Sequence, residues 1–380
     1  MRVALVRYRY SSHGGAERYV DALAEGLVSS GAEVRILAAD WEGSPGKGFS
    51  VETISVLRRP SSIRLFLFAA RVRAWARANP GWLLFSFERI PGAEVFRAGD
   101  GCHAEWLIRK RPLRPRSWGL DYLRPFNLSS LFLERRVFRS EALRAVIAIS
   151  AMGKREIIRH FGVAGEVISV VYNGVDLSRF PVERKAEARD ALRCRFGVTG
   201  EEPVFLYVGS GFARKGVRTL IRAAGRVAAR GIPFRLVLVG KGDPRPYLAE
   251  SGPARDRLLF TGPSRGAEEY FLGADAFVFP TLYEPFGSVC LEAMAAGLPV
   301  VTTCFSGASE VLRDGESGFV LSDPLDDAAL ADRMERLCRK DLREKMGAAS
   351  RVKAESMSRE KNVRETLAVL SEVWRGKTGG

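Results

Sequence analysis

The chain has 380 residues, of which 46% are hydrophobic, which is enough for two ordinary domains with sizeable cores. It has no run of 18 or more uncharged apolar residues, and its five cysteines are scattered without a Cys-x-x-Cys pair, which argues against a membrane-spanning protein, a disulfide framework and a zinc site. Lys and Arg number 59 against 44 Asp and Glu, and this net charge of +15 favours an anionic partner without distinguishing nucleic acid, membrane surface and phosphorylated substrate.

Strand-like and helical patterns alternate along the chain in two successive series. The strands of the first series are expected at residues 2–6, 33–37, 83–85, 146–149 and 167–171. The first two are joined by an amphipathic helix expected at 17–29. The strands of the second series are expected at residues 204–208, 234–239, 258–261, 276–279 and 300–302. They are separated by helical patterns such as 217–230, 267–272 and 288–296. This alternation is typical of parallel sheets with crossover helices, so we predict an α/β fold with two Rossmann-like domains.

The turn-rich residues Asn173-Gly174-Val175-Asp176 indicate where one domain gives way to the next. We expect an N-terminal domain at 1–173, a C-terminal domain at 174–357, and a last helix within 358–380 that returns to the first domain. Ligands of such folds bind beyond the carboxyl ends of the strands, and a cleft between two facing domains is the default active site. The loops that directly follow strands are therefore the candidates for function.

The first of these loops follows the first strand and opens a helix. Gly14 and Gly15 let a ligand approach the backbone, and a helix N-terminus favours an anion. A plain tight turn would also explain the two glycines, but the position after the first strand favours binding. The loop lacks the Gly-x-Gly-x-x-Gly pattern, so a nicotinamide cofactor is not expected.

A second glycine-rich loop follows the first strand of the second series. It begins at Gly209 and carries two adjacent cations, Arg214 and Lys215. Such a pair can neutralise the charge that develops on a leaving phosphate. A solvated Arg-Lys pair is an equally good interpretation of this loop taken alone.

The third segment has the strongest pattern. Glu284 follows the strand at 276–279, and Glu292 lies eight positions later in a helix that begins near Gly287. The amides of residues 287–289 would lie at the helix N-terminus, where a phosphate oxygen can accept hydrogen bonds from them. The helix is otherwise apolar, so the Glu292 carboxylate needs a partner, and sugar hydroxyls would serve. The alternative is that Glu292 lies on an exposed face.

The Glu-x7-Glu spacing of Glu284 and Glu292, with Phe286-Gly287 after the first and a leucine before the second, resembles glycosyltransferase family 4. Gly14-Gly15 and Arg214-Lys215 fit the same family, and the three motifs follow its order over nearly the full chain. The resemblance implies a GT-B fold, in which two Rossmann-like domains face each other across a cleft, and a nucleotide diphosphate sugar as donor.

A narrower resemblance is to the lipopolysaccharide core heptose α-1,3-glucosyltransferases, which implies UDP-glucose as donor and an inner-core heptose as acceptor. It rests on Tyr8-Arg9-Tyr10, Gly14-Gly15 with Arg18, Trp41-Glu42-Gly43, Pro91-Gly92 with Val95, Asp100 with Cys102, Ala104-Glu105, Gly209-Ser210 with Phe212, and Arg214 to Val217. Two positions depart from that group: Tyr19 replaces an acidic residue after the loop arginine, and Pro285-Phe286 follows the broader family.

The resemblance also assigns roles to individual residues. Those implied to bind the donor are Gly14, Gly15, Gly209, Arg265, Phe286, Gly287, Ser288, Val289 and Glu292. Those implied to act in catalysis are Asp100, Arg214, Lys215 and Glu284. The two cations would hold the diphosphate, Glu284 would contact sugar hydroxyls and Glu292 the ribose, Asp100 would face the sugar or the acceptor, and Arg265 would lie near the uracil.

The family implies retention of the anomeric configuration without a metal or other cofactor. No Asp-x-Asp pair follows a strand as a cation site, so Arg214 and Lys215 would take the place of a metal. We expect front-face attack, in which the leaving phosphate accepts the proton of the acceptor hydroxyl. Asp100 is the residue that could act instead as general base or nucleophile.

Positive charge is concentrated in the first part of the chain: residues 1–170 hold 27 basic and 16 acidic residues, a net +11. Between Glu105 and Arg139, nine Lys or Arg outnumber three acids and interleave with the aromatic residues Trp106, Trp118, Tyr122, Phe126, Phe132 and Phe138. This composition suits an anionic membrane surface or a lipid-linked acceptor. A solvated basic loop and a nucleic-acid site are the alternatives.

We therefore expect a UDP-sugar donor, a lipopolysaccharide core or other lipid-linked acceptor, and no nucleic-acid partner. The protein would be cytoplasmic and peripheral on the inner face of the cytoplasmic membrane. Nucleotide-sugar epimerases and phosphorylases share this fold, and a non-catalytic basic binding protein is the interpretation from another class. The presence of both Glu284 and Glu292 argues against a non-catalytic protein.

Overall fold

The computed structural model describes residues 1–10, 15–42, 48–56, 60–113, 115–264 and 266–378, with backbone alone at 15–18. The chain divides into two compact units. Unit 1 comprises Met1–Tyr172 together with Arg359–Gly380, and unit 2 comprises Asn173–Ser358. The sequence predicted divisions after residues 173 and 357, and the two units divide after Tyr172 and Ser358.

Unit 1 is built on a seven-stranded sheet in which every neighbouring pair is parallel. In spatial order the strands are β5 (Phe49–Thr53), β3 (Glu33–Ala38), β1 (Arg2–Val6), β6 (Leu83–Ser86), β7 (Val95–Ala98), β8 (Ala145–Ala148) and β9 (Ile168–Val170). A separate pair joins β2 (Arg9–Tyr10) to β4 (Asp40–Trp41). The chain order reverses between β1 and β6, which is the switch point of a Rossmann-type sheet.

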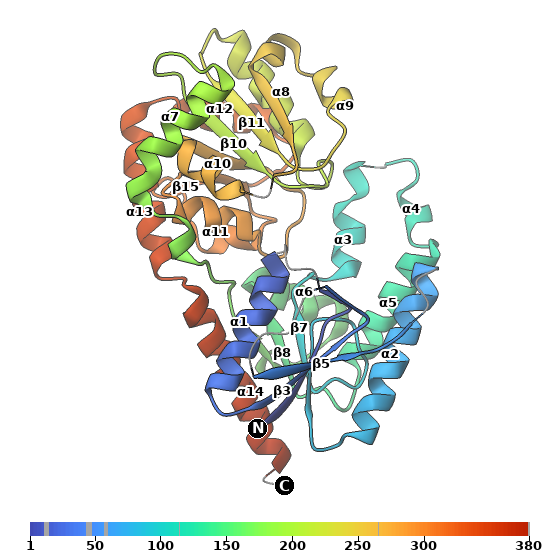
Figure 1. The fold of residues 1–380 in the computed structure, drawn as a ribbon. Coiled ribbons are helices and arrows are strands. Elements are labelled where there is room, and N and C mark those ends of the chain that lie inside the picture. The colour runs from blue at the N-terminus through green and yellow to red at the C-terminus, as the bar shows by residue number, and fades with distance from the viewer. Residues whose placement is uncertain (11–14, 43–47, 57–59, 114, 265, 379–380) are drawn as a thin grey trace. The chain divides into compact units, whose positions relative to one another are not determined.

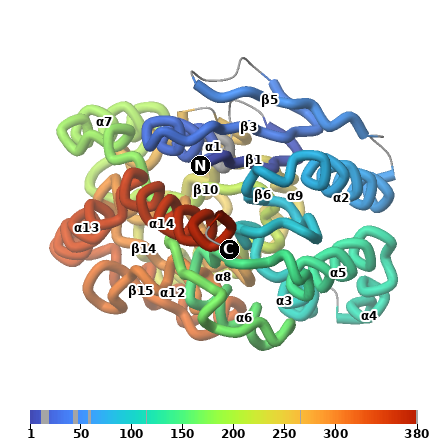
Figure 2. Tube along the Cα trace, turned by 90° about the horizontal axis from the view of Figure 1, so that it is seen from below, coloured from blue at the N-terminus to red at the C-terminus, as the bar shows by residue number. Residues whose placement is uncertain are grey.

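The helices of unit 1 cover both faces of this sheet. They are α1 (Gly15–Ser29), α2 (Ser61–Ala78), α3 (His103–Arg109), α4 (Trp118–Asp121), α5 (Pro125–Phe138), α6 (Ala151–Phe161) and α14 (Arg359–Thr378), with 3-10 turns η1 (Arg111–Leu113) and η2 (Gly165–Val167). Strand residues alternate between the faces: Val3 and Leu5 pack in the core with α1 and α14, whereas Ala4 and Val6 pack with α2 and α5. Figure 2 shows α14 beside α1, and α2 beside α5.

The last helix belongs to unit 1 although it follows unit 2 along the chain. Val363 and Leu370 of α14 lie in the same core as Val3 and Leu5, and Lys377, in the last turn of the helix, forms an ion pair with Glu94 at 2.6 Å. The last helix predicted within 358–380 is therefore present and packs on the sheet of unit 1.

Unit 2 is built on a six-stranded parallel sheet with the order expected for a Rossmann fold. In spatial order the strands are β12 (Leu258–Gly262), β11 (Arg235–Val239), β10 (Val204–Val208), β13 (Ala276–Phe279), β14 (Val300–Thr303) and β15 (Gly318–Leu321). The central strands β10, β13 and β14 are almost entirely buried, as parallel strands covered on both faces require. The switch point lies between β10 and β13.

The helices of unit 2 pack in pairs that Figure 1 shows side by side: α8 with α12, and α7 with α10. The full set is α7 (Lys185–Phe196), α8 (Val217–Ala229), α9 (Arg245–Leu248), α10 (Ala267–Gly273), α11 (Ser288–Ala295), α12 (Asp327–Arg336) and α13 (Lys340–Glu355). The 3-10 turns are η3 (Leu177–Arg179), η4 (Val182–Arg184), η5 (Gly252–Arg257) and η6 (Gly307–Glu310).

Candidate active site

Three loops at the carboxyl ends of β10, β13 and β14 are tied together at the switch point of unit 2. The carbonyl of Arg214, after β10, accepts hydrogen bonds from the Leu282 amide at 2.9 Å and the Thr281 hydroxyl at 3.3 Å, both after β13. The Glu284 amide in turn donates to the carbonyl of Phe305, after β14, at 2.9 Å. The loops predicted to carry chemistry are therefore held as one unit where an α/β sheet places its ligand.

Three of the predicted catalytic side chains meet at this point. Arg214 Nη1 lies 2.8 Å from Glu284 Oε2, and Lys215 Nζ lies 4.0 Å from the same oxygen. Arg214 also donates to the Tyr283 carbonyl at 2.8 Å, which fixes its guanidinium. The cluster holds two cations against one carboxylate, so it carries an excess positive charge that suits a phosphate group.

Lys215 is held beneath the glycine-rich loop rather than in solvent. Its ammonium lies 5.3 Å from the Phe279 ring centroid, and a Cβ at Gly209 would come within 2.9 Å of Lys215 Cδ. Burial lowers the pKa of Lys215, and the nearby Glu284 carboxylate opposes that shift. An anion bound beside the ammonium would compensate for its lost hydration.

The path of this loop depends on Gly216, the N-cap of α8. Its φ is +73°, and an added Cβ would lie 1.8 Å from the Pro280 carbonyl oxygen. No side chain fits at position 216, because both the positive φ and the contact with Pro280, the residue after β13, exclude it. Gly216 thus brings the loop of Arg214 and Lys215 against the loop of Glu284.

A buried hydroxyl lies directly under the same loop. Tyr207, in β10, is fully buried, and its hydroxyl has no hydrogen-bond partner among the residues that the structure describes. A Cβ at Gly209 would lie 3.3 Å from that hydroxyl, and burial raises the pKa of Tyr207. A buried polar atom without a partner is uncommon in folded proteins.

Helix α11 begins at this site with a left-handed N-cap. Gly287 has φ +90°, and Ser288 and Val289 form the first turn, whose amides cannot find partners within the helix. Asn173 donates to the Ser288 hydroxyl at 2.9 Å. The Phe286 ring is buried, and its carbonyl accepts from the Ala308 amide at 2.6 Å, so Phe286 shapes the turn through packing.

Glu292 has a protein partner that the sequence did not reveal. It is half-buried, and Arg179 Nη1 lies 3.7 Å from its carboxylate. Arg179 also pairs with Glu268 in the first turn of α10 and lies 5.6 Å from the ring centroid of Phe180. The partner that this carboxylate was expected to need is supplied in part by the protein itself, and Arg179 links α11 to α10 beside the candidate site.

Asp100 lies in unit 1, in the exposed turn that follows β7. The charged groups near it are Glu88 and Arg89, from the loop after β6. Arg89 pairs with the buried Glu134 at 3.3 Å and donates to the Gly101 carbonyl at 3.4 Å. Burial raises the pKa of Glu88, the charge of Arg7 opposes that shift, and the charge of Asp100 adds to it. The Glu88 carboxylate accepts a hydrogen bond from the Tyr8 amide at 3.0 Å. Asp100 thus stands at the edge of a buried polar network.

Two predicted donor-binding residues, Gly14 and Arg265, lie outside the described residues. Gly15 is described by its backbone and is the first residue of α1. None of the described residues forms a group of three or more His, Cys, Asp or Glu that could hold a metal ion. All five cysteines are free thiols.

The acidic side chains of the basic segment of unit 1, from Glu105 to Arg139, are buried. Glu105, Asp121 and Glu134, its three acidic residues, are each at most 2% exposed. Each is paired with cations: Glu105 with Arg109, Arg159 and His160; Asp121 with Lys110 and Arg124; Glu134 with Arg89. The described surface of this segment therefore carries positive charge without exposed carboxylates.

The apolar residues on that surface differ from those expected. Of the six aromatic residues, Phe126 and Phe132 are exposed, whereas Phe138 is buried and Trp118 donates its indole N–H to the Leu107 carbonyl. The two most exposed apolar side chains of the segment are Leu120 and Leu123. We use the name basic apolar surface for a set of exposed apolar and basic residues of this segment: Leu120, Leu123, Phe126, Leu128, Phe132, Arg116, Arg135, Arg136 and Arg139. No helix in the described part of the chain has the length and apolarity needed to cross a membrane.

Known proteins share both the sequence and the fold of this chain. Residues 13–179 match the family described as Glycosyltransferase Family 4, and residues 188–353 match the family described as Glycosyl transferases group 1. The chain is 27% identical over 335 residues to lipopolysaccharide glucosyltransferase WaaG of Escherichia coli K12, covering 85% of this chain and 86% of that protein. It is 33% identical over 399 residues to a D-inositol 3-phosphate glycosyltransferase of Xylanimonas cellulosilytica, covering 96% and 92%.

A solved structure of WaaG, titled as a glycosyltransferase involved in lipopolysaccharide biosynthesis, superposes with a TM-score of 0.82 at 24% identity and covers all of both chains. That likeness establishes the fold of two parallel-sheet α/β domains known as GT-B. Taken together, the family matches and the relatives show that the chain belongs to glycosyltransferase family 4 and is a nucleotide-sugar glycosyltransferase.

Proposed function

We propose that this enzyme transfers glucose from UDP-glucose to a heptose of the lipopolysaccharide inner core, with retention and without a metal. The observation that carries the proposal is the cluster of Arg214, Lys215 and Glu284 beside the N-terminus of α11. The name of the Escherichia coli relative supports the choice of sugar and acceptor.

In this proposal the donor diphosphate binds between the two cations and the first-turn amides of α11. Arg214 and Lys215 neutralise the charge that grows on the leaving phosphate, and amides 287–289 donate to its oxygens. Glu284 accepts hydrogen bonds from sugar hydroxyls. Glu292 binds the ribose, and Arg179 positions its carboxylate through the contact at 3.7 Å.

The reaction needs no side chain as base. The bond from the anomeric carbon to the diphosphate breaks on the face where the acceptor oxygen forms its new bond. The acceptor's proton passes to the leaving phosphate oxygen, which becomes more basic as the bond breaks. Asp100 contacts the sugar or the acceptor in this scheme. An Asp100→Asn variant tests whether Asp100 has only this binding role or acts as a base or nucleophile. A loss of several orders of magnitude in kcat with unchanged donor affinity would assign it the chemical role.

We propose further that the basic apolar surface docks on the cytoplasmic face of an anionic membrane, where a lipid-linked acceptor is presented. Leu120 and Leu123 are 64% and 67% exposed, which is costly in water but suits insertion among headgroups. The burial of all three acids supports this assignment, because no exposed carboxylate of the segment repels an anionic lipid.

The test is a panel of UDP-, GDP- and ADP-sugars with purified enzyme, in which nucleotide release is measured by mass spectrometry. Each donor is offered with and without a lipopolysaccharide core that ends in heptose. UDP release from UDP-glucose that depends on the acceptor is the expected result. Nucleotide release from another donor, or transfer of the sugar to another lipid or polysaccharide acceptor, would change the substrate assignment within the family.

A Glu284→Gln variant provides the matched control for this panel. It keeps the size of the side chain and removes the charge that faces Arg214. We expect it to lose turnover with every donor. The anomeric configuration of the product, read by NMR, tests retention, and activity in excess EDTA tests the absence of a metal.

A further inference from the structure

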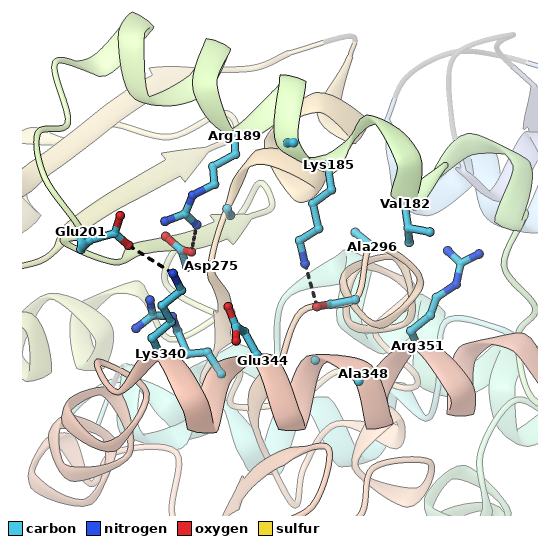
Figure 3. A pocket seen from close by; sticks show the side chains of 15 residues that line it. Val182, Lys185, Arg189, Glu201, Asp275, Ala296, Lys340, Glu344, Ala348 and Arg351 are labelled. Carbon is cyan, nitrogen blue, oxygen red and sulfur yellow. Dashed lines mark hydrogen bonds and ion pairs between the residues drawn. The ribbon is translucent and has the colours of Figure 1, made fainter.

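Unit 2 contains a second cationic pocket that the proposed donor site does not use. It has a volume of about 520 Å³ and lies between α7 and α13, whose side chains line it from opposite walls (Figure 3). Five of its lining residues are cations, Lys185, Arg189, Lys340, Arg343 and Arg351. Three are acids, Glu201, Asp275 and Glu344, which leaves a net charge of +2.

Two of the five cations lack a carboxylate within 4 Å among the residues that the structure describes. Lys185 donates to the Gly297 carbonyl at 3.0 Å, and Arg343 donates to the carbonyls of Leu337 at 3.0 Å and Cys338 at 2.7 Å. Arg343 is only 5% exposed. Carbonyl groups satisfy these donors but do not neutralise their charge, and a buried charge without a counterion is unfavourable.

The two helices that form the walls begin in an unusual way. Each has an arginine as N-cap without a side-chain cap hydrogen bond, followed by a lysine: Arg184-Lys185 in α7 and Arg339-Lys340 in α13. Cations at a helix N-terminus oppose the helix dipole, and Ser, Thr, Asp or Asn are preferred there. The nearby acids, Glu187 and Asp341, pair with the arginines. Both lysines line the pocket, where Lys340 lies 3.8 Å from the Glu201 carboxylate and Lys185 donates to the Gly297 carbonyl (Figure 3).

Capping of α11 accounts for only part of this arrangement. Lys185 and Arg351 each donate to carbonyls at the end of α11, those of Gly297 and Ala295. An ammonium has three N–H donors, and the carbonyl of Gly297 uses one of them. Burial lowers the pKa of Lys185, and the charges of Asp275 and Glu344 oppose that shift without cancelling it.

We propose that this pocket binds a phosphate monoester that carries hydroxyl groups, such as a sugar phosphate or a nucleoside monophosphate. Such a phosphate has a charge of roughly −2 at neutral pH, which matches the excess of the pocket. Lys185 and Lys340 hold the phosphate, and the Glu344 carboxylate, which points into the pocket in Figure 3, accepts from the hydroxyls.

The proposal is tested by calorimetric titration of the full chain with glucose 1-phosphate, UMP and inorganic phosphate. We expect Lys340→Ala to weaken binding of the preferred monoester about fivefold and Lys185→Gln to weaken it about tenfold, as for a lost charged hydrogen bond. The matched control is Lys345→Ala, an exposed lysine of the same helix that does not line the pocket and is expected to bind normally.

A Lys215→Ala variant separates this pocket from the donor loop, and therefore from the proposed function. Binding that survives Lys215→Ala and weakens in Lys340→Ala supports the proposal, and the tighter of glucose 1-phosphate and UMP identifies the source of the monoester. Binding that is lost in Lys215→Ala and unchanged in Lys340→Ala would overturn it. Equal affinity for inorganic phosphate would overturn the assignment of a hydroxyl-bearing ligand.

Discussion

Arg214 joins two loops and, in our proposal, also neutralises the donor diphosphate. Its guanidinium contacts Glu284 and the Tyr283 carbonyl, both at 2.8 Å. We predict that Arg214→Gln lowers kcat by about 10²–10³-fold, because a preorganised cation that meets developing charge is worth several kcal/mol. The measurement is steady-state turnover of the preferred donor with its acceptor.

The control for this variant is Arg218→Gln, which removes an exposed arginine from α8 that pairs with Glu250 at 3.0 Å. We expect it to keep near-normal turnover, since exposed ion pairs contribute little. Equal losses in the two variants would show that bulk charge matters, rather than the position of Arg214.

Gly216 allows a residue-scale test of the loop geometry. Its φ is +73° and its missing Cβ leaves room for the Pro280 carbonyl, only 1.8 Å from the ideal Cβ position. We predict that Gly216→Ala lowers the free energy of unfolding by about 3 kcal/mol or more, from strain and steric overlap together. The measurement is the urea unfolding curve.

A second glycine separates those two causes. Gly231 has φ +75° but nothing within 4 Å of an added Cβ, so Gly231→Ala is expected to cost only about 1 kcal/mol. If both variants lost the same stability, the contact with Pro280 would have no effect and the close approach of the two loops would be wrong.

At the scale of elements, His103 fixes the start of α3 against α5. Its amide donates to Glu134 at 2.8 Å, and its Nε2 lies 3.0 Å from Asn127 Oδ1. Burial, followed by the positive charge of Arg89, lowers the pKa of His103 to about 4. The folded protein therefore keeps a neutral imidazole over a pH range in which the unfolded chain, with a pKa of about 6.5, binds a proton.

This difference predicts the sign of a pH effect. The unfolded state binds more protons between pH 6.5 and 4, so stability is complete above pH 6.5 and falls as the pH is lowered through that window. We predict that His103→Gln, whose amide can still donate to Asn127, is less sensitive to pH than the wild type. Between pH 7 and 5, its free energy of unfolding should fall by on the order of 1 kcal/mol less than that of the wild type. Urea unfolding at both pH values measures it, and identical pH profiles would contradict it.

The elements that the sequence predicted well are the buried parallel strands, because short continuous runs of Val, Ile, Leu and Phe are typical of such strands. β1, β10 and β13 occupy the predicted residues, and the predicted helices correspond to α1, α8, α10, α11 and α14. In the two large sheets, the strands β5, β7 and β15 were not predicted, and the short pair of β2 and β4 was not predicted either. β5 is an edge strand with Ser50 and Glu52, and β7 is short and includes Arg97, so neither shows a clear apolar run.

The candidate site also has a part that could be predicted from the sequence and a part that could not. Arg214 and Glu284 could be predicted together because the Rossmann order brings the ends of β10 and β13 side by side. Arg179 could not, because its contact with Glu292 joins a 3-10 turn to a distant helix and leaves no periodic signal. The burial of Glu105, Asp121 and Glu134 was equally hidden, since composition counts charges without showing which side they face.

At the scale of the whole molecule, the net charge of +15 becomes meaningful through its distribution. Much of the excess lies in residues 1–170, where the basic apolar surface has no exposed acid of its own segment to offset it. Each cation near an anionic membrane contributes about 1 kcal/mol, and inserted leucines add hydrophobic burial. Because this surface combines positive charge with exposed apolar side chains, we expect its binding to a membrane to need both.

We therefore predict that the protein binds vesicles containing anionic phosphatidylglycerol at low salt and that added NaCl weakens the binding, because salt screens the attraction. Leu123→Asp should weaken binding about tenfold or more, since it replaces an inserted apolar side chain by a repelled charge. The control is Val352→Asp in α13 of unit 2, because Leu123 and Val352 are both 67% exposed. Co-sedimentation measures both variants. Absence of binding at low salt, an equal loss in the two variants, or displacement of the vesicles by DNA would each contradict membrane docking through this surface.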